Sequence, residues 1–445
     1  MERLYKDSGI KWIGRIPKDW KTCSFSNAIL RMATGLNPRD NFILTNDDEY
    51  YYVTIRNFKD GKLFLDENCD RISPEAWEII QVRSQLHKGD ILFASISKDG
   101  QAYLLNNEPK NWNINESVFC IRVNKTLFNN GYFYYHIIDE GFHKELRMDA
   151  TGATFQSIKQ NKLRKSVMCL PPISEQQLIA KYLDEKCGEI DRLITLQEQM
   201  IVQLTDYKQS VITEAVTKGI NPNAHLIPSG IDWIGGIPEH WEMQRLKTLG
   251  WTQNGISQSG DYFGEDYAYP FVSYSDAYKN YSIPYPEGRA NSSDKDRKTY
   301  SLVEGDVLFT RTSETIEEIG FSSTCLETIK DAVYSGFLIR FRPTSNKLYK
   351  GFSKYYFRSQ VHRAYFVKQM NIVTRASLGQ DLLKNLVVLL PPLAEQHAIA
   401  EHLDIKCGEI DRLIEIKRQK IDTLKEYKKS VIYEAVTGKT DLRDS

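Results

Sequence analysis

Two stretches of the chain carry apolar residues at seven-residue intervals, which is the spacing of a coiled-coil helix. Each stretch follows a Leu-Pro-Pro sequence, and proline blocks a helix from starting earlier. The main apolar register contains Leu183, Ile190, Leu204 and Val211 in the first stretch, and Leu403, Ile410, Leu424 and Val431 in the second. A companion register, which we expect to complete the same face, contains Leu193, Met200 and Tyr207, and then Leu413 and Tyr427. Gln197 and Lys417 interrupt the main register at equivalent places, either to set the register or because the seam is partly exposed there.

The length of these helices constrains how they pair. Each contains about 40 residues and would extend about 60 Å. Parallel pairing would oblige the domain between them to carry the chain back over that distance, whereas a domain of about 160 residues has a radius of gyration of about 15 Å. Antiparallel pairing avoids this return. The pattern therefore predicts an antiparallel rod with one domain at each end, related by a pseudo-twofold axis.

The two helical stretches belong to an internal repeat that covers about half of the chain. SGIKWIGRIPKDW at residues 8–20 recurs as SGIDWIGGIPEHW at residues 229–241. Residues 170–217 and 390–437 are identical at 30 of 48 aligned positions. Between these segments the two halves correspond only faintly. A duplicated frame with divergent fillings indicates two related domains that do one kind of job on two different targets, and the alternative is the drift of a duplicated enzyme.

The divergent segments mix short β-rich runs with one aromatic helical stretch each, at residues 132–146 and 352–366. The β-rich runs are residues 50–55, 90–94 and 117–123, and then 269–273, 306–309 and 337–342. We therefore predict an α/β fold class, in which two α/β domains are joined by two long antiparallel coiled-coil helices. The predicted domains are an N-terminal domain (1–169), a central helix (170–220), a C-terminal domain (221–389) and a C-terminal helix (390–445).

The composition is that of an ordinary globular protein. The 445 residues include 58 Lys and Arg against 58 Asp and Glu, so the formal net charge is zero, which weighs against a polycation that coats nucleic acid. By region, the basic and acidic residues number 24 and 21 in 1–169, 5 and 8 in 170–228, 19 and 18 in 229–389, and 10 and 11 in the rest. The predicted domains are thus slightly basic (+3 and +1) and the helical segments slightly acidic (−3 and −1).

The seven cysteines are scattered and form no CxxC pair, so neither a disulfide framework nor a zinc site is indicated. No apolar run approaches the ~20 residues that span a bilayer, and the start lacks the apolar core of a signal peptide. We expect free thiols, no membrane partner and a cytoplasmic location.

The search for catalytic motifs is negative. No GxGxxG opens a helix and no HExxH is present. The LPPI and LPPL sequences share only their prolines with the (N/D)PP(Y/F) loop of amino-methyltransferases. Residues 415–417 (EIK) mimic the end of a nuclease motif, yet they lie in the middle of a predicted helix. We expect no catalytic residue and no metal ligand.

The paired SGIxWIGxIPxxW segments, the two divergent domains and the LPPxxEQxxIAxxLDxKCGEIDRLI helices that end in SVIxEAVT resemble the specificity subunit of type I restriction-modification systems. The resemblance covers essentially the whole chain. It implies a non-catalytic subunit whose two target recognition domains each read one half of a bipartite, asymmetric site in double-stranded DNA. It also implies two methyltransferase subunits that use S-adenosylmethionine, and restriction subunits that translocate and cut DNA with ATP and Mg²⁺. None of these cofactors would be bound by this chain.

Base readout in the major groove needs Arg, Lys, Asn, Gln, Ser or Thr at loop tips. Three pairs of loops supply such residues, although each could instead carry surface hydroxyls that contact nothing. The first pair contains Thr54 and Arg56, with Ser273 and Ser275; the second contains Ser95, Ser97 and Lys98, with Arg311, Thr312 and Ser313. The third contains Thr151, Gly152, Thr154, Gln156 and Ser157, with Thr374, Arg375 and Ser377, and resembles the TGxTQxxI segment of the family. The rival functions are a structural heterodimerisation scaffold and a nuclease with an unrecognised site.

Overall fold

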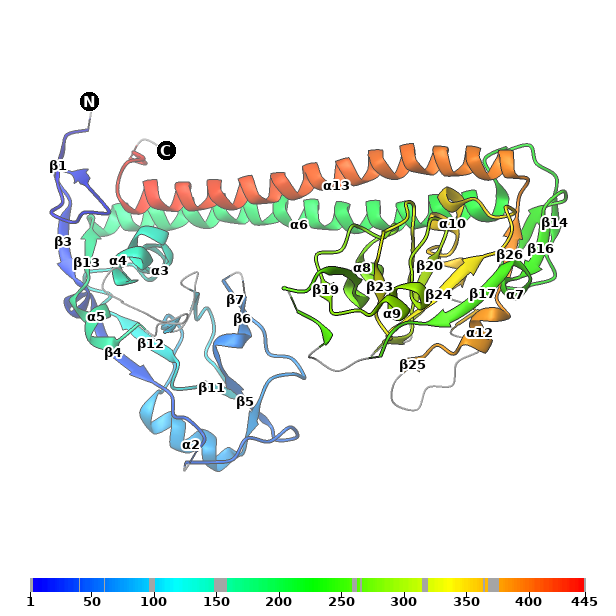
Figure 1. The fold of residues 1–445 in the computed structure, drawn as a ribbon. Helices are drawn as coiled ribbons and strands as arrows, with labels where there is room; N and C mark the ends of the chain where they lie inside the picture. The colour runs from blue at the N-terminus through cyan, green and yellow to red at the C-terminus, as the bar shows by residue number, and fades with distance from the viewer. Residues whose placement is uncertain are drawn as a thin grey trace. The chain divides into compact units, whose positions relative to one another are not determined.

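The computed structural model divides into two compact units, each built from parts of both sequence repeats (Figure 1). Unit 1 contains Met1–Gln197 and Gln419–Ser445, and unit 2 contains Glu198–Arg418. The residues that the structure describes are 3–39, 41–59, 61–95, 101–147, 158–257, 262–264, 266–313, 319–362, 365–366 and 376–443.

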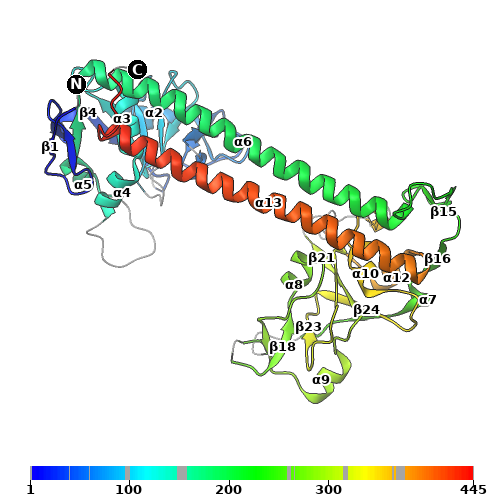
Figure 2. The ribbon, with the colours of Figure 1, turned by 90° about the horizontal axis from the view of Figure 1, so that it is seen from above.

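Two long helices, α6 (Ile173–Lys218) and α13 (Leu393–Val436), run side by side and contribute to both units (Figures 1 and 2). In unit 1, Lys428 Nζ lies 2.7 Å from a carboxylate oxygen of Asp191, and in unit 2 Lys208 Nζ lies 2.6 Å from one of Asp411. Asp191 and Asp411 are equivalent positions of the repeat, 220 residues apart, and so are Lys208 and Lys428. In unit 1 the aspartate lies on α6 and the lysine on α13, and in unit 2 the aspartate lies on α13 and the lysine on α6. Within each unit the early part of one helix therefore packs on the late part of the other, which confirms antiparallel pairing.

The burial pattern confirms the main apolar register and corrects the companion register. Leu183, Ile190, Leu403 and Ile410 are almost fully buried. Leu193, Tyr207, Leu413 and Tyr427 are 43–58% exposed instead, and Met200 is half-buried. A heptad seam can be completed three or four residues after its main register. Here the buried or half-buried positions are those that lie four residues after it. They are Cys187, Ile194 and Ile201 in α6, and Cys407, Ile414 and Ile421 in α13.

Of the two interrupting residues, Gln197 is 3% exposed and so belongs to the buried seam, while Lys417 is half-buried. A buried amide in an apolar seam costs stability and opposes a shift of register.

The predicted strands are confirmed, and both units arrange them in the same order. In unit 1 a four-stranded antiparallel sheet has the order β10-β9-β12-β4, and a three-stranded sheet, in which β11 and β5 are parallel, has the order β11-β5-β8. The equivalent sheets of unit 2 have the orders β22-β20-β24-β17 and β23-β18-β19. The strands of unit 1 are β4 (Ile29–Thr34), β5 (Tyr50–Val53), β8 (Arg71–Ile72), β9 (Ile91–Ala94), β10 (Ala102–Leu104), β11 (Trp112–Ile114) and β12 (Val118–Val123). Those of unit 2 are β17 (Gly250–Asn254), β18 (Tyr269–Val272), β19 (Arg289–Ala290), β20 (Val307–Thr310), β22 (Ser322–Thr324), β23 (Val333–Tyr334) and β24 (Leu338–Pro343).

Short helices cover these sheets. The predicted stretch at 132–146 forms two helices, because the buried carboxylate of Asp139 accepts the backbone N–H groups of Gly141 and Phe142 and starts a new helix. The helices of unit 1 are α1 (Phe25–Ala28), η1 (Ile55–Asn57), α2 (Pro74–Arg83), α3 (Asn130–Ile138), α4 (Glu140–Arg147) and α5 (Gln160–Lys165). Those of unit 2 are α7 (Leu246–Leu249), α8 (Tyr274–Lys279), α9 (Asp294–Thr299), α10 (Lys350–Tyr356) and α12 (Gln380–Lys384).

The repeated SGIxWIG segments pack where the long helices begin and end. In unit 1 the fully buried Trp20 donates its indole N–H to Glu175 at the start of α6 (2.8 Å), and Gly438, just beyond the end of α13, lies against the same indole. In unit 2 Trp241 donates to Glu395 at the start of α13 (3.1 Å). The remaining short strands are β1 (Tyr5–Asp7), β2 (Arg15–Pro17), β3 (Lys21–Ser24), β6 (Phe58–Lys59), β7 (Lys62–Leu63), β13 (Val167–Leu170), β14 (Leu226–Pro228), β15 (Gly236–Pro238), β16 (Glu242–Arg245), β21 (Thr312–Ser313), β25 (Ala376–Ser377) and β26 (Val387–Leu390).

Candidate nucleic-acid interface

The two units build the same loop junction from different residues. In unit 1, Ser95 follows β9; its backbone N–H donates to Ser117 O (2.9 Å), and its carbonyl accepts the N–H of Ile158 (2.7 Å). In unit 2, Arg311 follows β20 and makes the same two backbone bonds, to Phe337 O (2.9 Å) and from Leu378 N–H (2.7 Å). The junction is therefore part of the shared backbone frame, and its side chains differ between the two units.

A buried ion pair anchors the strand that leads into each junction. The Arg342 guanidinium donates two hydrogen bonds of 2.7 and 2.6 Å to the Asp306 carboxylate, whose side chain has no exposed surface. The Arg122 guanidinium donates two equivalent hydrogen bonds to Asp90 (2.9 and 2.8 Å). Each carboxylate also accepts a backbone N–H from three residues earlier. These bonds fix the first residue of the turn and hence the direction of β9 and β20.

Two of the predicted hydroxyls cap short helices. Ser273 Oγ accepts the backbone N–H of Asp276 (3.2 Å), and the Asp276 carboxylate accepts the backbone N–H of Ser273 (2.8 Å). These two bonds form a capping box. Thr54 begins η1 with a similar capping box. In both units the residue two positions later, Arg56 or Ser275, is exposed. The caps leave Arg56 and Ser275 as the accessible members of this pair of loops.

Ser95 and Arg311 differ in accessibility although their backbones are equivalent. Ser95 is 4% exposed, and its hydroxyl donates to Ser117 O (2.7 Å) within the domain. Arg311 is half-buried, and its guanidinium makes no hydrogen bond or ion pair within the described residues. Ser95 thus has a structural role in this conformation, whereas Arg311 is available to a ligand.

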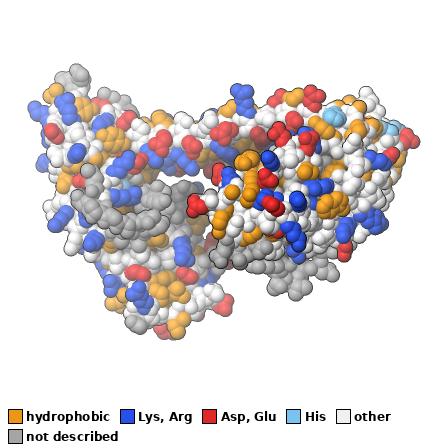
Figure 3. All heavy atoms as spheres, viewed as in Figure 1, with side chains coloured by type: hydrophobic (Ala, Val, Ile, Leu, Met, Phe, Trp, Pro, Cys, Tyr) orange, Lys and Arg blue, Asp and Glu red, His pale blue; other side chains and the backbone are white. Residues whose placement is uncertain are grey.

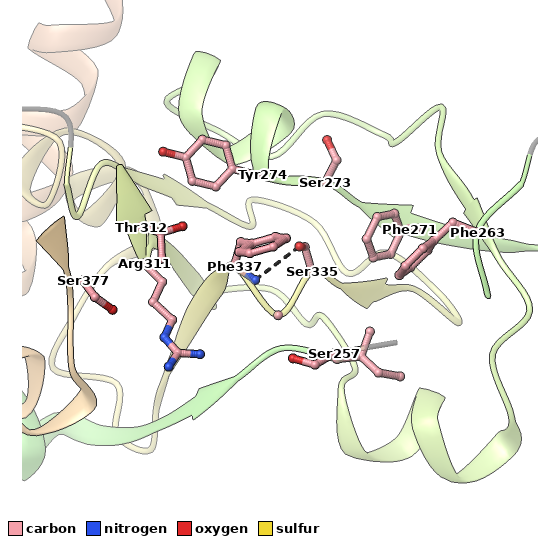
Figure 4. Close-up of a pocket in the computed structure, with 12 residues that line it drawn as sticks. Ser257, Phe263, Phe271, Ser273, Tyr274, Arg311, Thr312, Ser335, Phe337 and Ser377 are labelled. Carbon is pink, nitrogen blue, oxygen red and sulfur yellow. Dashed lines mark hydrogen bonds between the residues drawn. The ribbon is translucent and has the colours of Figure 1, made fainter. Parts of the chain in front are cut away.

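Unit 2 contains a cavity of about 550 Å³ at this junction (Figure 4). It brings together four of the predicted residues, because Thr312 in β21 pairs with Ser377 in β25, Arg311 precedes Thr312, and Ser273 lies across from them. Sequence reasoning searched for polar residues and missed the apolar part of the lining. The full lining is Ile256, Ser257, Phe263, Phe271, Ser273, Tyr274, Arg311, Thr312, Ser335, Gly336, Phe337 and Ser377. The sequence did contain one indication of this site: Phe337 aligns with Ser117 in the repeat, so an aromatic residue stands in unit 2 where unit 1 has a small polar one.

The other predicted contact residues lie outside the described residues and stay predictions. They are Ser97, Lys98, Thr151, Gly152, Thr154, Gln156, Ser157, Thr374 and Arg375, together with the side chain of Ser313.

Burial keeps His136, His143 and the Cys169 thiol neutral near pH 7. It lowers the pKa of His136 to about 3 and that of His143 to about 4, and it raises the pKa of the Cys169 thiol to about 12. A thiol that stays protonated is a poor nucleophile. Within the part of the chain that the structure describes, no three His, Cys, Asp or Glu side chains are grouped to hold a metal ion.

The surface carries mixed charge. On the face drawn in Figure 3, Lys and Arg side chains are interspersed with Asp and Glu rather than gathered into one basic surface. No helix among the described residues is long and apolar enough to cross a membrane.

Comparison with known proteins identifies relatives along nearly the whole chain. The family model for the type I restriction modification DNA specificity domain matches residues 19–205 and 238–426. A putative type I restriction enzyme MjaX specificity subunit from Methanocaldococcus jannaschii is 26% identical over 460 residues, which cover 99% of each chain. The type I restriction enzyme EcoKI specificity subunit from Escherichia coli is 22% identical over 413 residues, which cover 88% of this chain and 82% of the relative.

Solved structures support the same fold. A chain from a structure of a type I R-M system superposes with a TM-score of 0.67 at 16% identity, covering 96% of this chain and 99% of its own. The HsdS subunit from Thermoanaerobacter tengcongensis superposes with a TM-score of 0.50 at 16% identity, covering 96% of this chain and 98% of its own.

Proposed function

Because the chain belongs to the type I restriction-modification DNA specificity family, we propose that its two units each read one half of a single bipartite, asymmetric DNA site. The chain is the DNA sequence-recognition subunit of such a system and is itself non-catalytic. We assign the reading to residues 1–169 and 221–389, and the spacing of the half-sites to the helical segments 170–220 and 390–445. The scaffold and nuclease alternatives are not favoured.

The difference between the two equivalent junctions carries the proposal of an asymmetric site. The backbone bonds are the same, yet Ser95 and Ser117 stand in unit 1 where Arg311 and Phe337 stand in unit 2. The Arg guanidinium and the exposed aromatic ring of unit 2 can contact the edges of base pairs. In unit 1 the Ser95 hydroxyl is bonded within the domain, which leaves the half-buried Ser117 at this junction. Two readers with one frame and different side chains should therefore bind two different half-sites.

Each unit also carries exposed apolar side chains on both long helices, and we define two of them as one patch per unit. Unit 1 carries exposed Leu193 and Tyr427, and unit 2 carries their repeat equivalents Leu413 and Tyr207. Exposed apolar side chains on a surface that repeats itself suit two copies of one partner. We propose that these patches dock the two methyltransferase subunits, one on each unit.

The catalytic cofactors belong to the partners in this proposal. S-adenosylmethionine would bind the methyltransferase subunits, and ATP and Mg²⁺ the restriction subunits. Such a complex works where the chromosome lies, so we expect the chain in the cytoplasm.

Mapping of methylated bases tests the function. The chain is co-expressed with its methyltransferase partner, and single-molecule sequencing of the host genome then reveals every modified adenine. We expect one motif with two unlike halves separated by a fixed spacer. A palindromic motif, or no motif, would overturn the proposal.

A further inference from the structure

Phe337 is an aromatic side chain that the fold leaves in solvent. It is 61% exposed, at the turn that leads into β24, while its neighbours Leu338 and Ile339 are fully buried. Its backbone N–H is held by Ser335 Oγ (3.3 Å) and its carbonyl by Arg311 N–H (2.9 Å), so the ring is presented by a fixed backbone. Figure 4 shows the ring on the wall of the unit 2 cavity, beside Arg311. Exposure of a Phe ring at a cavity mouth calls for an apolar ligand group.

Arg311 differs from the arginines of unit 2 that hydrogen-bond within its domain. Arg342 is bonded to Asp306, and Arg358 donates to the backbone carbonyls of Ala277, Tyr278 and Ser322. The guanidinium of Arg311, by contrast, makes no hydrogen bond, ion pair or ring contact with any described residue. The guanidinium therefore presents five N–H donors at the cavity wall that have no acceptor among the described residues, and a bound ligand could supply that acceptor.

The rest of the lining is apolar or carries hydroxyls. Phe263 and Phe271 pack with ring centroids 4.4 Å apart, and Ser257, Thr312 and Ser377 add hydroxyl groups. Among the described residues that line the cavity, Arg311 is the one cationic side chain. This chemistry fits the edges of bases, which combine acceptors with methyl groups, better than it fits a phosphate.

We infer that Arg311 and Phe337 form a specificity-determining pair, in which Arg311 donates to O6 and N7 of a guanine and Phe337 packs on the C5-methyl group of a nearby thymine. The inference rests on the proposed function and names two bases of the half-site read by unit 2. Guanine offers two acceptors in the major groove that match the guanidinium, and thymine is the base with a methyl group there. Because Arg311 and Phe337 are hydrogen-bonded neighbours on adjacent strands, about 5 Å apart, the two bases lie within one or two steps of each other.

Unit 1 has no counterpart of the Arg311 and Phe337 pair. At the equivalent backbone positions Ser95 is buried and Ser117 replaces the aromatic ring. At this junction unit 1 therefore makes no contact with a thymine methyl group of its own half-site.

Uracil substitution isolates the methyl group, because uracil differs from thymine only by lacking it. The purified complex of the full chain with its methyltransferase partner is bound to duplexes that carry its mapped site, and each thymine of the unit 2 half-site is replaced in turn by uracil. We expect one such replacement to weaken binding about fourfold, the effect of removing one buried methyl group. In Phe337→Ala, the thymine and uracil duplexes should bind equally well.

Variants with matched controls complete the test. Arg311→Ala should lower the preference for guanine at one position about tenfold or more, whereas Lys330→Ala, an exposed cation outside the cavity lining, should not. Tyr285→Ala is the control for Phe337→Ala, because Tyr285 is 70% exposed in the same unit and does not line the cavity. The inference is overturned if no thymine in that half-site is sensitive to uracil, or if the sensitivity survives in Phe337→Ala. Either result leaves the proposed function standing, provided that the complex still methylates an asymmetric bipartite site.

Discussion

Two glycines that follow the ends of the long helices should differ in how much their replacement by alanine costs. Gly219 and Gly438 have φ values of +77° and +72°, a left-handed conformation that an L-residue adopts at a cost of about 1–2 kcal/mol. At Gly438 a Cβ atom would lie 2.5 Å from Pro17 Cδ and 2.9 Å from the Trp20 indole, both of them rigid groups. At Gly219 its nearest contact would be the Glu395 carboxylate oxygen at 2.9 Å, the end of a flexible side chain, with Trp241 at 3.4 Å.

Gly438→Ala therefore adds overpacking of about 1–3 kcal/mol to the conformational cost, while Gly219→Ala adds little. We expect the free energy of unfolding to fall by about 2–5 kcal/mol in Gly438→Ala and by about 1–2 kcal/mol in Gly219→Ala. Equilibrium urea unfolding followed by tryptophan fluorescence measures both. Equal losses, or a larger loss in Gly219→Ala, would refute the packing described for Trp20 and Pro17.

Three further predictions follow from buried or exposed charges and from the exposed apolar patches. Asp306→Asn should cost about 3 kcal/mol of unfolding free energy, because it leaves the Arg342 guanidinium without its buried counter-charge; in the same urea titration Asp381→Asn, at a 97% exposed carboxylate, should cost almost nothing. Burial raises the pKa of Asp139 to about 6, so the folded state binds more protons than the unfolded state between about pH 4 and 6. Its contribution to stability must fall as the pH rises through that window, by about 3 kcal/mol in all, and Asp139→Asn, which can still cap α4, should flatten this part of the unfolding profile. The double variant Leu193→Asp, Tyr427→Asp in unit 1 should remove one methyltransferase subunit from the purified complex, which native mass spectrometry would show as the loss of one partner mass. The surface variant Lys330→Asp should keep both subunits. Loss of both subunits from the unit 1 variant would contradict separate docking patches.

The architecture could be predicted from the sequence because its determinants are periodic or repeated. The spacing of Leu183, Ile190, Leu403 and Ile410 marks the buried seam, and the repeat makes the strand order of one unit a copy of the other. The companion register was wrong because Leu193 and Tyr207 are apolar yet exposed. Hydrophobicity alone does not separate a residue that packs within the chain from one available to a partner.

The candidate site was predictable only in part, because a loop residue's role depends on what surrounds it. Arg311 and Thr312, from the second predicted loop pair, meet Ser377 of the third pair in one cavity. Thr54 and Ser273 cap helices, and the Ser95 hydroxyl bonds within its domain. These roles depend on the local backbone geometry, which a pattern of hydroxyl residues does not encode. Phe337 was missed because an aromatic residue at the start of a strand is usually buried, and only the fold shows that this one is not.

We expect each unit to read its own half of the DNA site independently of the other unit. Exchange of residues 21–169 for the corresponding segment of another member of the family, followed by sequencing of methylated bases in cells that express the hybrid with the methyltransferase partner, tests it most directly. The hybrid should methylate a site with a new sequence in one half, while the other half and the spacer length stay unchanged. A change in both halves, or in the spacer, would contradict it.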